Sequence, residues 1–343
     1  MNMNIQIIAE LAQGFEGCPQ QARLLMKAAA AAGADVAKYQ LVYVDEVATP
    51  DYKYYDLLRS LEMADDVWIC LADYARELGI QLNTDIYGTR SLRLAERIGV
   101  SAVKLHGTDI ANMGLLNEVA GSSVKKVLLG AGGAYFSELQ QAIDILSSKE
   151  IVILLGFQGY PTPIDANQID RVRLLVERIV KVHSNVTIGF ADHAAPSSPL
   201  SLALAAVALG AGARVFEKHL TLGEIMKLED YEAALNPDRF YEFSTALREC
   251  ADAYGVSTDD PDFGMSEAEN GYRKMIRRHV VTKRALQAGT RIDQGDVLLK
   301  RSAAASPLTD LNEAYGATVK RDMAVNEALL PSDLSNNGVL YEP

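Results

Sequence analysis

The sequence contains little cysteine and no long apolar run, and both absences limit what the protein can be. Only three cysteines occur in 343 residues, none in a CxxC pair, which argues against a disulfide framework or a cysteine metal site. No stretch approaches the roughly 20 apolar residues that a membrane-spanning helix needs. The first apolar run follows no charged leader segment with a cleavage site. We therefore expect a cytoplasmic protein without a membrane partner.

Positive charge is also scarce. Lys and Arg number 33 against 45 Asp and Glu, a net charge of −12. Such a balance opposes binding to a nucleic-acid backbone, so no nucleic-acid partner is expected. An anionic small substrate would need its own local group of Lys, Arg or metal. With 49% hydrophobic residues, the chain can nevertheless bury one large core and a smaller one.

Short β-branched runs alternate with longer Ala- and Leu-rich amphipathic stretches up to about residue 220, as in repeated βα units. The predicted strands span residues 5–11, 35–41, 80–85, 102–106, 126–130, 151–156, 186–192 and 213–219. Eight strands favour a closed (β/α)8 TIM barrel, an α/β fold, over an open sheet, because eight strands close around a filled interior.

A turn-rich acidic segment, STDDPDFGMSEAENG, then interrupts this rhythm. It predicts a barrel domain over residues 1–258, a linker over 259–273 and a small C-terminal domain over 274–343. Within the last domain, TKRAL is followed by AGTRI and VKRDMAV by NEALL. These similar segments indicate a two-part, pseudo-symmetric module.

Functional groups of a TIM barrel lie at the C-terminal ends of its strands, and polar residues gather at those ends here. They are Glu10, Lys38, Gln40, Thr84, Asp85, Lys104, His106, Asp192, His193, Glu217 and His219. Side chains from different strands are therefore expected to converge on one mouth.

Two histidines, His193 in GFADHAA and His219 in FEKHLT, end neighbouring strands. At about one strand spacing apart, they are predicted to hold one cation together. Imidazoles with carboxylates nearby suit Mn²⁺, Fe²⁺ or Zn²⁺ by ligand type. A lone histidine such as His106 is more often a hydrogen-bonded structural residue.

Two lysines, Lys38 and Lys104, lie inside apolar runs, where an unpaired ammonium is expensive to bury. Two interpretations stay open. The lysines form salt bridges to Glu10 or Asp85, or they cradle a phosphate or carboxylate as point charges. The turn GAGGA over residues 130–134 also leaves backbone N–H groups free to approach an anion.

Ordered motifs over residues 5–335 resemble the sialic acid synthase family, which joins phosphoenolpyruvate to N-acetylmannosamine or a related N-acyl amino sugar. The motifs are IIAELAQGFEG, GADVAKYQ, NTD, KLHGTD, GYPTP, ADHAA, EKHLTL and LEDYEAALNPDRF. The C-terminal segment resembles the SAF, or antifreeze-like, β-clip domain of that family. The resemblance implies a nonulosonic (sialic-type) acid synthase for surface polysaccharide biosynthesis with a divalent metal cofactor, Mn²⁺ or Mg²⁺.

The resemblance also implies a role for each matched residue. The set comprises catalytic Glu10 and Asp109, substrate-binding Lys38, Gln40, Thr84, Asp85, Lys104, Gln158, Tyr160, Asp230 and Arg301, and metal-binding His193 and His219. Glu10 and Asp109 are alternative candidates for the base that activates water. In the family the cap of one subunit closes the barrel of its partner, which implies a domain-swapped homodimer, and Arg301 matches the arginine that reaches the N-acyl group.

Departures from the family fall where hydroxyl groups would hold the anion. Gly107 replaces a serine, Gly130 and Ala131 replace a serine-threonine pair, and Gln158 replaces an asparagine. Further departures are Gly14, Phe15, Tyr231 and Ser302. Each lost hydroxyl removes a hydrogen bond worth roughly 1 kcal/mol. Either glycine amides replace the hydroxyls or the substrate differs, and the pattern resembles a divergent branch such as spore coat polysaccharide biosynthesis protein E.

Three rival functions remain open. The first is a phosphoenolpyruvate-condensing synthase for a legionaminic- or pseudaminic-type or other acceptor. The second is a metal-dependent aldolase or isomerase without phosphoenolpyruvate, which the lost serines favour and the two lysines and SAF-like segment oppose. The third is a catalytically silent sugar-binding protein, which the presence of Glu10, Lys38, Lys104, His193 and His219 opposes.

Overall fold

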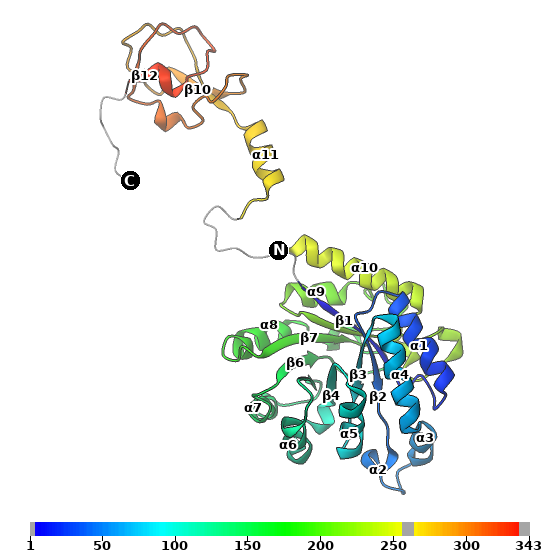
Figure 1. Cartoon of the computed structure of the whole chain (residues 1–343). Helices are drawn as coiled ribbons and strands as arrows, with labels where there is room; N and C mark the ends of the chain where they lie inside the picture. Colours follow the sequence, from blue (N-terminus) through cyan, green and yellow to red (C-terminus); the bar gives the residue numbers. More distant parts are fainter. Residues whose placement is uncertain (1–3, 256–263, 336–343) are drawn as a thin grey trace. The chain divides into compact units, whose positions relative to one another are not determined.

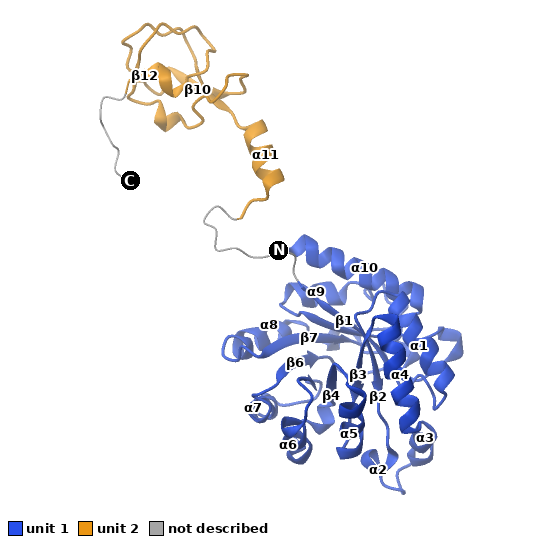
Figure 2. Cartoon of the chain, viewed as in Figure 1, with its two compact units in different colours: residues 1–256 blue, residues 257–343 orange. Residues whose placement is uncertain are grey.

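The computed structural model describes residues 4–255 and 264–335. The chain divides into two compact units, residues 1–256 and 257–343 (Figure 2). Of the predicted linker, residues 259–263 lie outside the described residues. The remainder is largely a helix, α11 (Glu267–Ile276), where the sequence analysis had predicted turns. No helix of the described ranges is long and apolar enough to cross a membrane.

Unit 1 is a closed barrel of eight parallel strands in sequence order, with helices around it (Figure 1). The strands are β1 (Gln6–Ala12), β2 (Val36–Gln40), β3 (Gln81–Asp85), β4 (Ala102–Leu105), β5 (Lys126–Gly130), β6 (Glu150–Leu155), β7 (Val186–Asp192) and β8 (Val215–His219). Pairing of β1 with β8 closes the barrel. The predicted TIM barrel is confirmed.

A helix follows each strand. These helices are α1 (Pro19–Ala31), α4 (Asp65–Leu78), α5 (Thr89–Ile98), α6 (Met113–Gly121), α7 (Phe136–Ile145), α8 (Asp170–Leu175), α9 (Leu204–Gly210) and α10 (Pro237–Tyr254). Two shorter helices, α2 (Val44–Val47) and α3 (Tyr55–Ser60), lie between β2 and α4. Helices α4 and α5 end at Gly79 and Gly99, both with φ of 70°, because glycine adopts this left-handed conformation without strain.

The strands present alternate residues to two cores. The outward residues pack against the helices, where Tyr39 meets Phe15 and Trp68 edge to face, with ring centroids 5.9 and 5.8 Å away. The inward residues form an apolar layer inside the barrel, made of Ile8, Val36, Ala102, Leu128, Val152, Leu154 and Val215. Two residues further along β1, β2, β4 and β8, the next inward side chains are charged. The site therefore stands directly on the barrel core.

Unit 2 contains two antiparallel strand pairs, β9 (His279–Thr282) with β10 (Val297–Lys300), and β11 (Thr318–Val319) with β12 (Leu334–Ser335). Each half of unit 2 contains an arginine whose side chain donates a hydrogen bond to an aspartate twelve residues later. Arg284 Nε donates to Asp296 at 2.6 Å, and Arg321 Nε donates to Asp333 at 2.7 Å. Because the two pairs have the same spacing in sequence, the structure shows the two-part module that the repeated segments indicated.

Candidate active site

Inward side chains at the ends of β1, β2, β3, β4 and β8 form a buried charged cluster. Lys38 lies at its centre and contacts Glu10, Asp85 at 2.5 Å and Glu217 at 3.5 Å. Lys104 lies 2.6 Å from Glu217 and 3.9 Å from Glu10. These five side chains are nearly inaccessible to solvent. Two ammonium groups therefore share three carboxyl groups in a site of low dielectric, where their interactions are strong.

The pKa values of the cluster indicate how its charge is balanced. Burial alone would lower the pKa of Lys38, but Asp85, Glu10 and Glu217 outweigh it and hold that pKa well above its usual value. Burial raises the pKa of Glu10 from 4.5 to about 8, against the effect of Lys38. The two lysines lower the pKa values of Asp85 and Glu217 despite their burial. At neutral pH a protonated Glu10 thus leaves two carboxylates opposite two ammonium groups.

A hydrogen-bonded relay extends from the cluster toward the loops. His106 Nε2 lies 2.9 Å from Asp85 Oδ2, and His106 Nδ1 lies 3.3 Å from Gln158 Nε2. If Gln158 donates to Nδ1, then Nε2 carries the proton and donates to Asp85. Asp85 therefore orients His106, which in turn positions Gln158.

Gln40 belongs to a second polar group at the same mouth. Its Oε1 accepts hydrogen bonds from Tyr87 OH and from Gln13 Nε2, each at 2.7 Å. Because both donors converge on one oxygen, the amide orientation of Gln40 is fixed. Gln13 lies in the loop after β1, so this pair links the β1 and β2 loops.

His193 and His219 lie side by side, as predicted, with ring centroids 5.2 Å apart. Tyr160 meets both rings edge-on, at 5.3 and 5.6 Å. Burial lowers the pKa of His193 to about 3, and burial together with His193 holds the pKa of His219 well below 6.5. Both imidazoles are therefore neutral at physiological pH, which is the form that binds metal.

The donor set fits a divalent cation bound by two histidines. His193 Nδ1 is buried and has no hydrogen-bond partner among the described residues, so a ligand atom is available there. Asp230 Oδ2 lies 3.8 Å from His219 Nδ1, too far for a hydrogen bond. No group of three or more His, Cys, Asp or Glu able to hold a metal occurs in the described ranges. Water or substrate would have to supply the other ligands.

Ten of the predicted site residues lie at this mouth. They are Glu10, Lys38, Gln40, Asp85, Lys104, Gln158, Tyr160, His193, His219 and Asp230. The interpretation of Lys38 and Lys104 as salt-bridged lysines is confirmed by these contacts. Anion binding by the same lysines stays a prediction.

Thr84 does not join them. Its register partners, Tyr39 and Val103, belong to the core between strands and helices, and side chains alternate along a strand. Thr84 is therefore on the outer face of β3, whereas Asn83 and Asp85 point inward. The prediction that Thr84 faces substrate is wrong for this reason.

Two other predicted site residues, Asp109 and Arg301, are not part of the cluster of unit 1 side chains described above. Asp109 ends a 3-10 turn, Gly107–Asp109, is half-buried, and lies 3.3 Å from the Thr108 hydroxyl. Its carboxylate makes no contact with the cluster among the hydrogen bonds and ion pairs of the described residues, which leaves Glu10 as the better placed candidate base. Arg301 belongs to unit 2, directly after β10, and is exposed.

Glu217 and His106, which the sequence analysis placed at the mouth without assigning either a role, belong to the site. Glu217 contacts both lysines, and His106 contacts Asp85. The signal was present in the sequence: each residue lies two positions from a predicted site residue, His219 or Lys104, on the same strand. A period of two places such pairs on one face.

The glycines that replace the family's hydroxyl residues lie where backbone segments touch. A Cβ added to Gly107 would collide with the carbonyl oxygen of Gly132, and one on Gly130 would lie 2.9 Å from Gly107 N. A Cβ on Gly132 would likewise collide with Gly156 O. The loops after β4, β5 and β6 thus pack backbone against backbone, which explains why serine is excluded at Gly107.

Fold and site together define a (β/α)8-barrel protein with a charged mouth and a separate C-terminal β unit. The model of the NeuB family matches residues 25–259, and that of the SAF domain matches residues 277–335. The chain belongs to the NeuB family. The resemblance to sialic acid synthases and the SAF assignment are therefore confirmed.

Several relatives are named as synthases. The chain is 23% identical to N,N'-diacetyllegionaminic acid synthase of Legionella pneumophila over 96% of its length and 94% of that protein. It is 26% identical to N-acetylneuraminate-9-phosphate synthase of Mus musculus, over 83% and 79%. The crystal structure of spore coat polysaccharide biosynthesis protein spsE from Bacillus subtilis matches with a TM-score of 0.63 and 23% identity, over 98% and 96%. The last likeness shows the shared fold.

Proposed function

We propose that the chain is a cytoplasmic synthase that condenses phosphoenolpyruvate with N-acetylmannosamine or a related N-acyl amino sugar. The products are a nonulosonic acid and phosphate. The observation that carries this proposal is the pair of buried lysines, Lys38 and Lys104, at the same mouth as the paired imidazoles of His193 and His219. Membership of the NeuB family and the names of its relatives support it.

Lys38 and Lys104 would bind the phosphate and carboxylate of phosphoenolpyruvate. Lysine binds such anions as a point charge. Lys38 stays protonated because its pKa lies well above the usual value. A protonated Glu10 makes the cluster neutral instead of negative, which lowers the repulsion that an incoming anion would meet. The carbonyl oxygens of Gly132 and Gly156 lie against the neighbouring glycine loops, and we assign anion binding to the lysines.

We further propose that His193 and His219 hold Mn²⁺ or Mg²⁺. Such a cation would act as a Lewis acid on the aldehyde oxygen of the open-chain acceptor. The lowered pKa values of both histidines keep one nitrogen of each ring unprotonated and able to bind the cation. Tyr160, edge-on to both rings, would limit where the acceptor lies.

Glu10 is the proposed base. C3 of phosphoenolpyruvate forms a bond to the aldehyde carbon, water adds at C2, and the C2–O bond to phosphate breaks. Glu10, which is protonated at neutral pH, first donates its proton to the new alkoxide oxygen and, once ionised, accepts a proton from that water. A carboxyl group with a pKa of about 8 is matched to proton transfer near neutral pH. Closure of the mouth by the cap of a partner subunit, which the resemblance implies, would exclude bulk water that competes with the ordered reaction.

The resemblance also leads us to propose a homodimer in which Arg301 contacts the N-acyl group. The mass of the full-length chain in solution, measured by light scattering, tests the dimer. A chain that is monomeric at working concentration and still active would contradict it.

The decisive experiment measures phosphate released from phosphoenolpyruvate by the full-length chain. N-acyl hexosamines are offered one at a time, with Mn²⁺, with Mg²⁺ and with a chelator. We expect release that requires both an acceptor and a metal. His219→Ala should abolish it, whereas His183→Ala, a half-buried histidine outside the mouth, should not. Absence of release with every acceptor would overturn the proposed function.

A further inference from the structure

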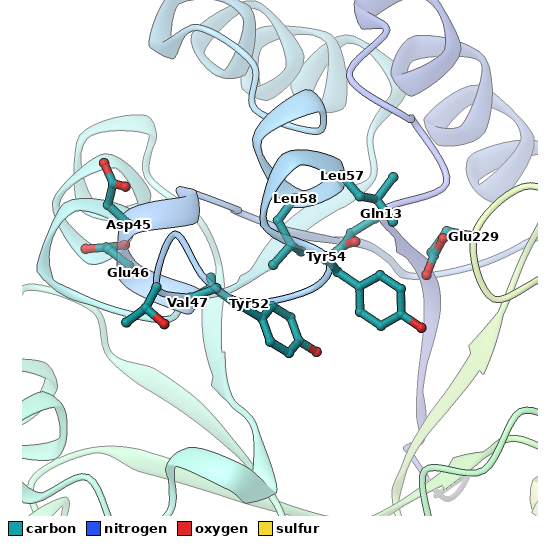
Figure 3. Close-up of a pocket in the computed structure, with 11 residues that line it drawn as sticks. Gln13, Asp45, Glu46, Val47, Tyr52, Tyr54, Leu57, Leu58 and Glu229 are labelled. Carbon is teal, nitrogen blue, oxygen red and sulfur yellow. The ribbon is translucent and has the colours of Figure 1, made fainter.

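A cavity of about 900 Å³ is lined by the loops after β1, β2 and β8 (Figure 3). Gln13, one of its lining residues, donates to Gln40 in the mouth at 2.7 Å. Glu229, another lining residue, directly precedes Asp230, whose carboxylate lies 3.8 Å from His219. The cavity therefore adjoins the candidate active site on two sides, and its volume is typical of small-molecule sites.

The lining combines aromatic and apolar surface with hydroxyl groups. Tyr52 and Tyr54 pack edge to face with ring centroids 5.7 Å apart, and both are about half exposed. Leu57 and Leu58 of α3 complete this wall. Tyrosine offers a flat apolar face together with a polar tip, and leucine offers surface for a methyl group. Such a wall suits a sugar ring that carries acyl substituents.

The charge of the lining has one sign. Asp45, Glu46 and Glu229 line the cavity, and no Lys or Arg lies among the lining residues in the described part of the chain. In Figure 3 Glu229 lies at one end of the cavity, and Asp45 and Glu46 lie at the other. A phosphate group placed inside would therefore meet carboxylates at either end.

Glu229, which is exposed, is the lining carboxylate without a protein partner among the described residues. Asp45 accepts a hydrogen bond from Tyr55 at 2.7 Å, and Glu46 accepts from two backbone N–H groups at the start of α5. Within residues 4–255 and 264–335, no hydrogen bond or ion pair of the Glu229 side chain is found. Burial, with Glu16 and Glu232 nearby, raises the pKa of Glu229, which is the sign of a negative local field.

Two cations of the same segment are engaged with aromatic rings. Lys53 Nζ lies 4.4 Å from the ring centroid of Tyr54. Arg59 stacks on Tyr55 and lies 3.7 Å from Asp45. Neither residue lines the cavity, so neither offsets Glu229.

We propose that this cavity receives the part of the acceptor remote from its aldehyde, and that it selects neutral N-acyl sugars over phosphorylated ones. The inference rests on the proposed function, since it takes an amino sugar as acceptor. Glu229 is the specificity-determining residue. It acts by repelling a phosphate, because like charges brought together without a counter-ion strongly disfavour the wrong partner.

The test compares N-acetylmannosamine with its 6-phosphate as acceptors for the full-length chain. Phosphate release gives kcat/KM for each, and calorimetry gives the Kd of each without turnover. We expect the neutral sugar to be preferred by about tenfold or more in both measurements. Glu229→Lys should reverse or abolish the preference, and Glu229→Gln should weaken it. The control is Glu224→Lys, the same charge change at an exposed residue of the same loop that does not line the cavity.

Each outcome bears on the proposal. Equal or better use of the phosphorylated sugar, or an equal response to Glu224→Lys and Glu229→Lys, would overturn it. Failure to bind either sugar would also overturn it. If the neutral sugar binds in preference but no phosphate is ever released from phosphoenolpyruvate, the selective cavity stands and the proposed reaction falls.

Discussion

Lys38 keeps its charge inside the barrel because three carboxyl groups surround it. Its side chain is fully buried, and its contacts come from β1, β3 and β8. A buried charge pair adds little net stability compared with apolar residues, but removal of one partner leaves the other charge uncompensated. The cluster therefore makes the fold depend on the residues proposed to bind substrate.

Replacement of Lys38 by Met tests this dependence. We expect Lys38→Met to lower the free energy of unfolding by about 3–5 kcal/mol and to abolish release of phosphate. The matched control is Lys126→Met at the N-terminal end of β5, where the ammonium is half-buried and donates only to Gln6, at 3.1 Å, among the described hydrogen bonds. Urea unfolding of both variants gives the comparison. Equal losses would show that the carboxylates around Lys38 do not require it.

Because of the raised pKa of Glu10, we expect the free energy of unfolding to fall as the pH rises. Its pKa is about 8 in the folded chain and 4.5 ordinarily, so between these values the folded state binds more protons than the unfolded state. Stability from this group is complete below about pH 4.5 and is lost as the pH rises through 8. In Glu10→Gln that titration is absent.

The measurement follows urea unfolding of the wild-type chain and Glu10→Gln between pH 7.5 and 9. Above pH 7 the two neutral histidines of the mouth no longer contribute, because unfolded histidine loses its proton near 6.5. The wild-type free energy should fall by roughly 0.8 kcal/mol across this range relative to the variant, most of it below pH 8.5. Parallel profiles would contradict a raised pKa for Glu10.

At the scale of elements, the strands were predictable and the side-chain directions were recoverable from them. Each β-branched run is a strand to within two residues, because such residues pack well on a pleated, buried surface. The period of two along β3 separates Asp85 from Thr84, and the same period along β8 joins Glu217 to His219. Applied to every strand, this period would have placed Thr84 on the outer face and Glu217 with the residues that were given a role.

Helix α11 was missed for a local reason. Its acidic, glycine-containing sequence was interpreted as a turn, yet Ser266 accepts a hydrogen bond from Glu269 N at 3.0 Å and caps the helix. Ser-x-x-Glu is a helix-start signal in its own right. By contrast, the backbone packing of the loops after β4 and β5 depends on contacts between distant segments, which a single sequence does not contain.

That loop packing predicts the effect of restoring the family's serine. In Gly107→Ser the new Cβ would collide with Gly132 O, so we expect a loss of about 1–3 kcal/mol in the free energy of unfolding. The control is Gly121→Ala at the end of α6, where an added Cβ meets no atom within 4 Å and stability should change by less than about 1 kcal/mol. A Gly107→Ser chain as stable as the control would show that these loops adjust freely.

At the scale of the whole molecule, each unit buries apolar residues of its own. The core of unit 2 includes Val280, Ile292 and Leu329, and its charged pairs, such as Arg284 with Asp296, lie within the unit. The barrel core likewise uses residues of unit 1 alone. A domain boundary near residue 258 was predicted from composition, and the compact units divide at residue 256. The prediction depended on the loss of the βα rhythm, which is a property of long stretches and survives local errors.

Separate cores predict separate unfolding. We expect the full-length chain to show two calorimetric transitions, and fragments 1–256 and 257–343 each to reproduce one of them. The small fragment should melt with the lower enthalpy, because unfolding enthalpy grows with chain length, by roughly 0.7 kcal/mol per residue near 60 °C.

The Arg–Asp pairs of unit 2, Arg284 with Asp296 and Arg321 with Asp333, allow the assignment of the two transitions to be checked. In the full-length chain, Arg321→Ala should lower the melting temperature of the transition assigned to residues 257–343. The melting temperature of the transition assigned to residues 1–256 should stay unchanged. A shift of both transitions together would mean that the two units unfold as one, and that the barrel mouth draws stability from the C-terminal unit.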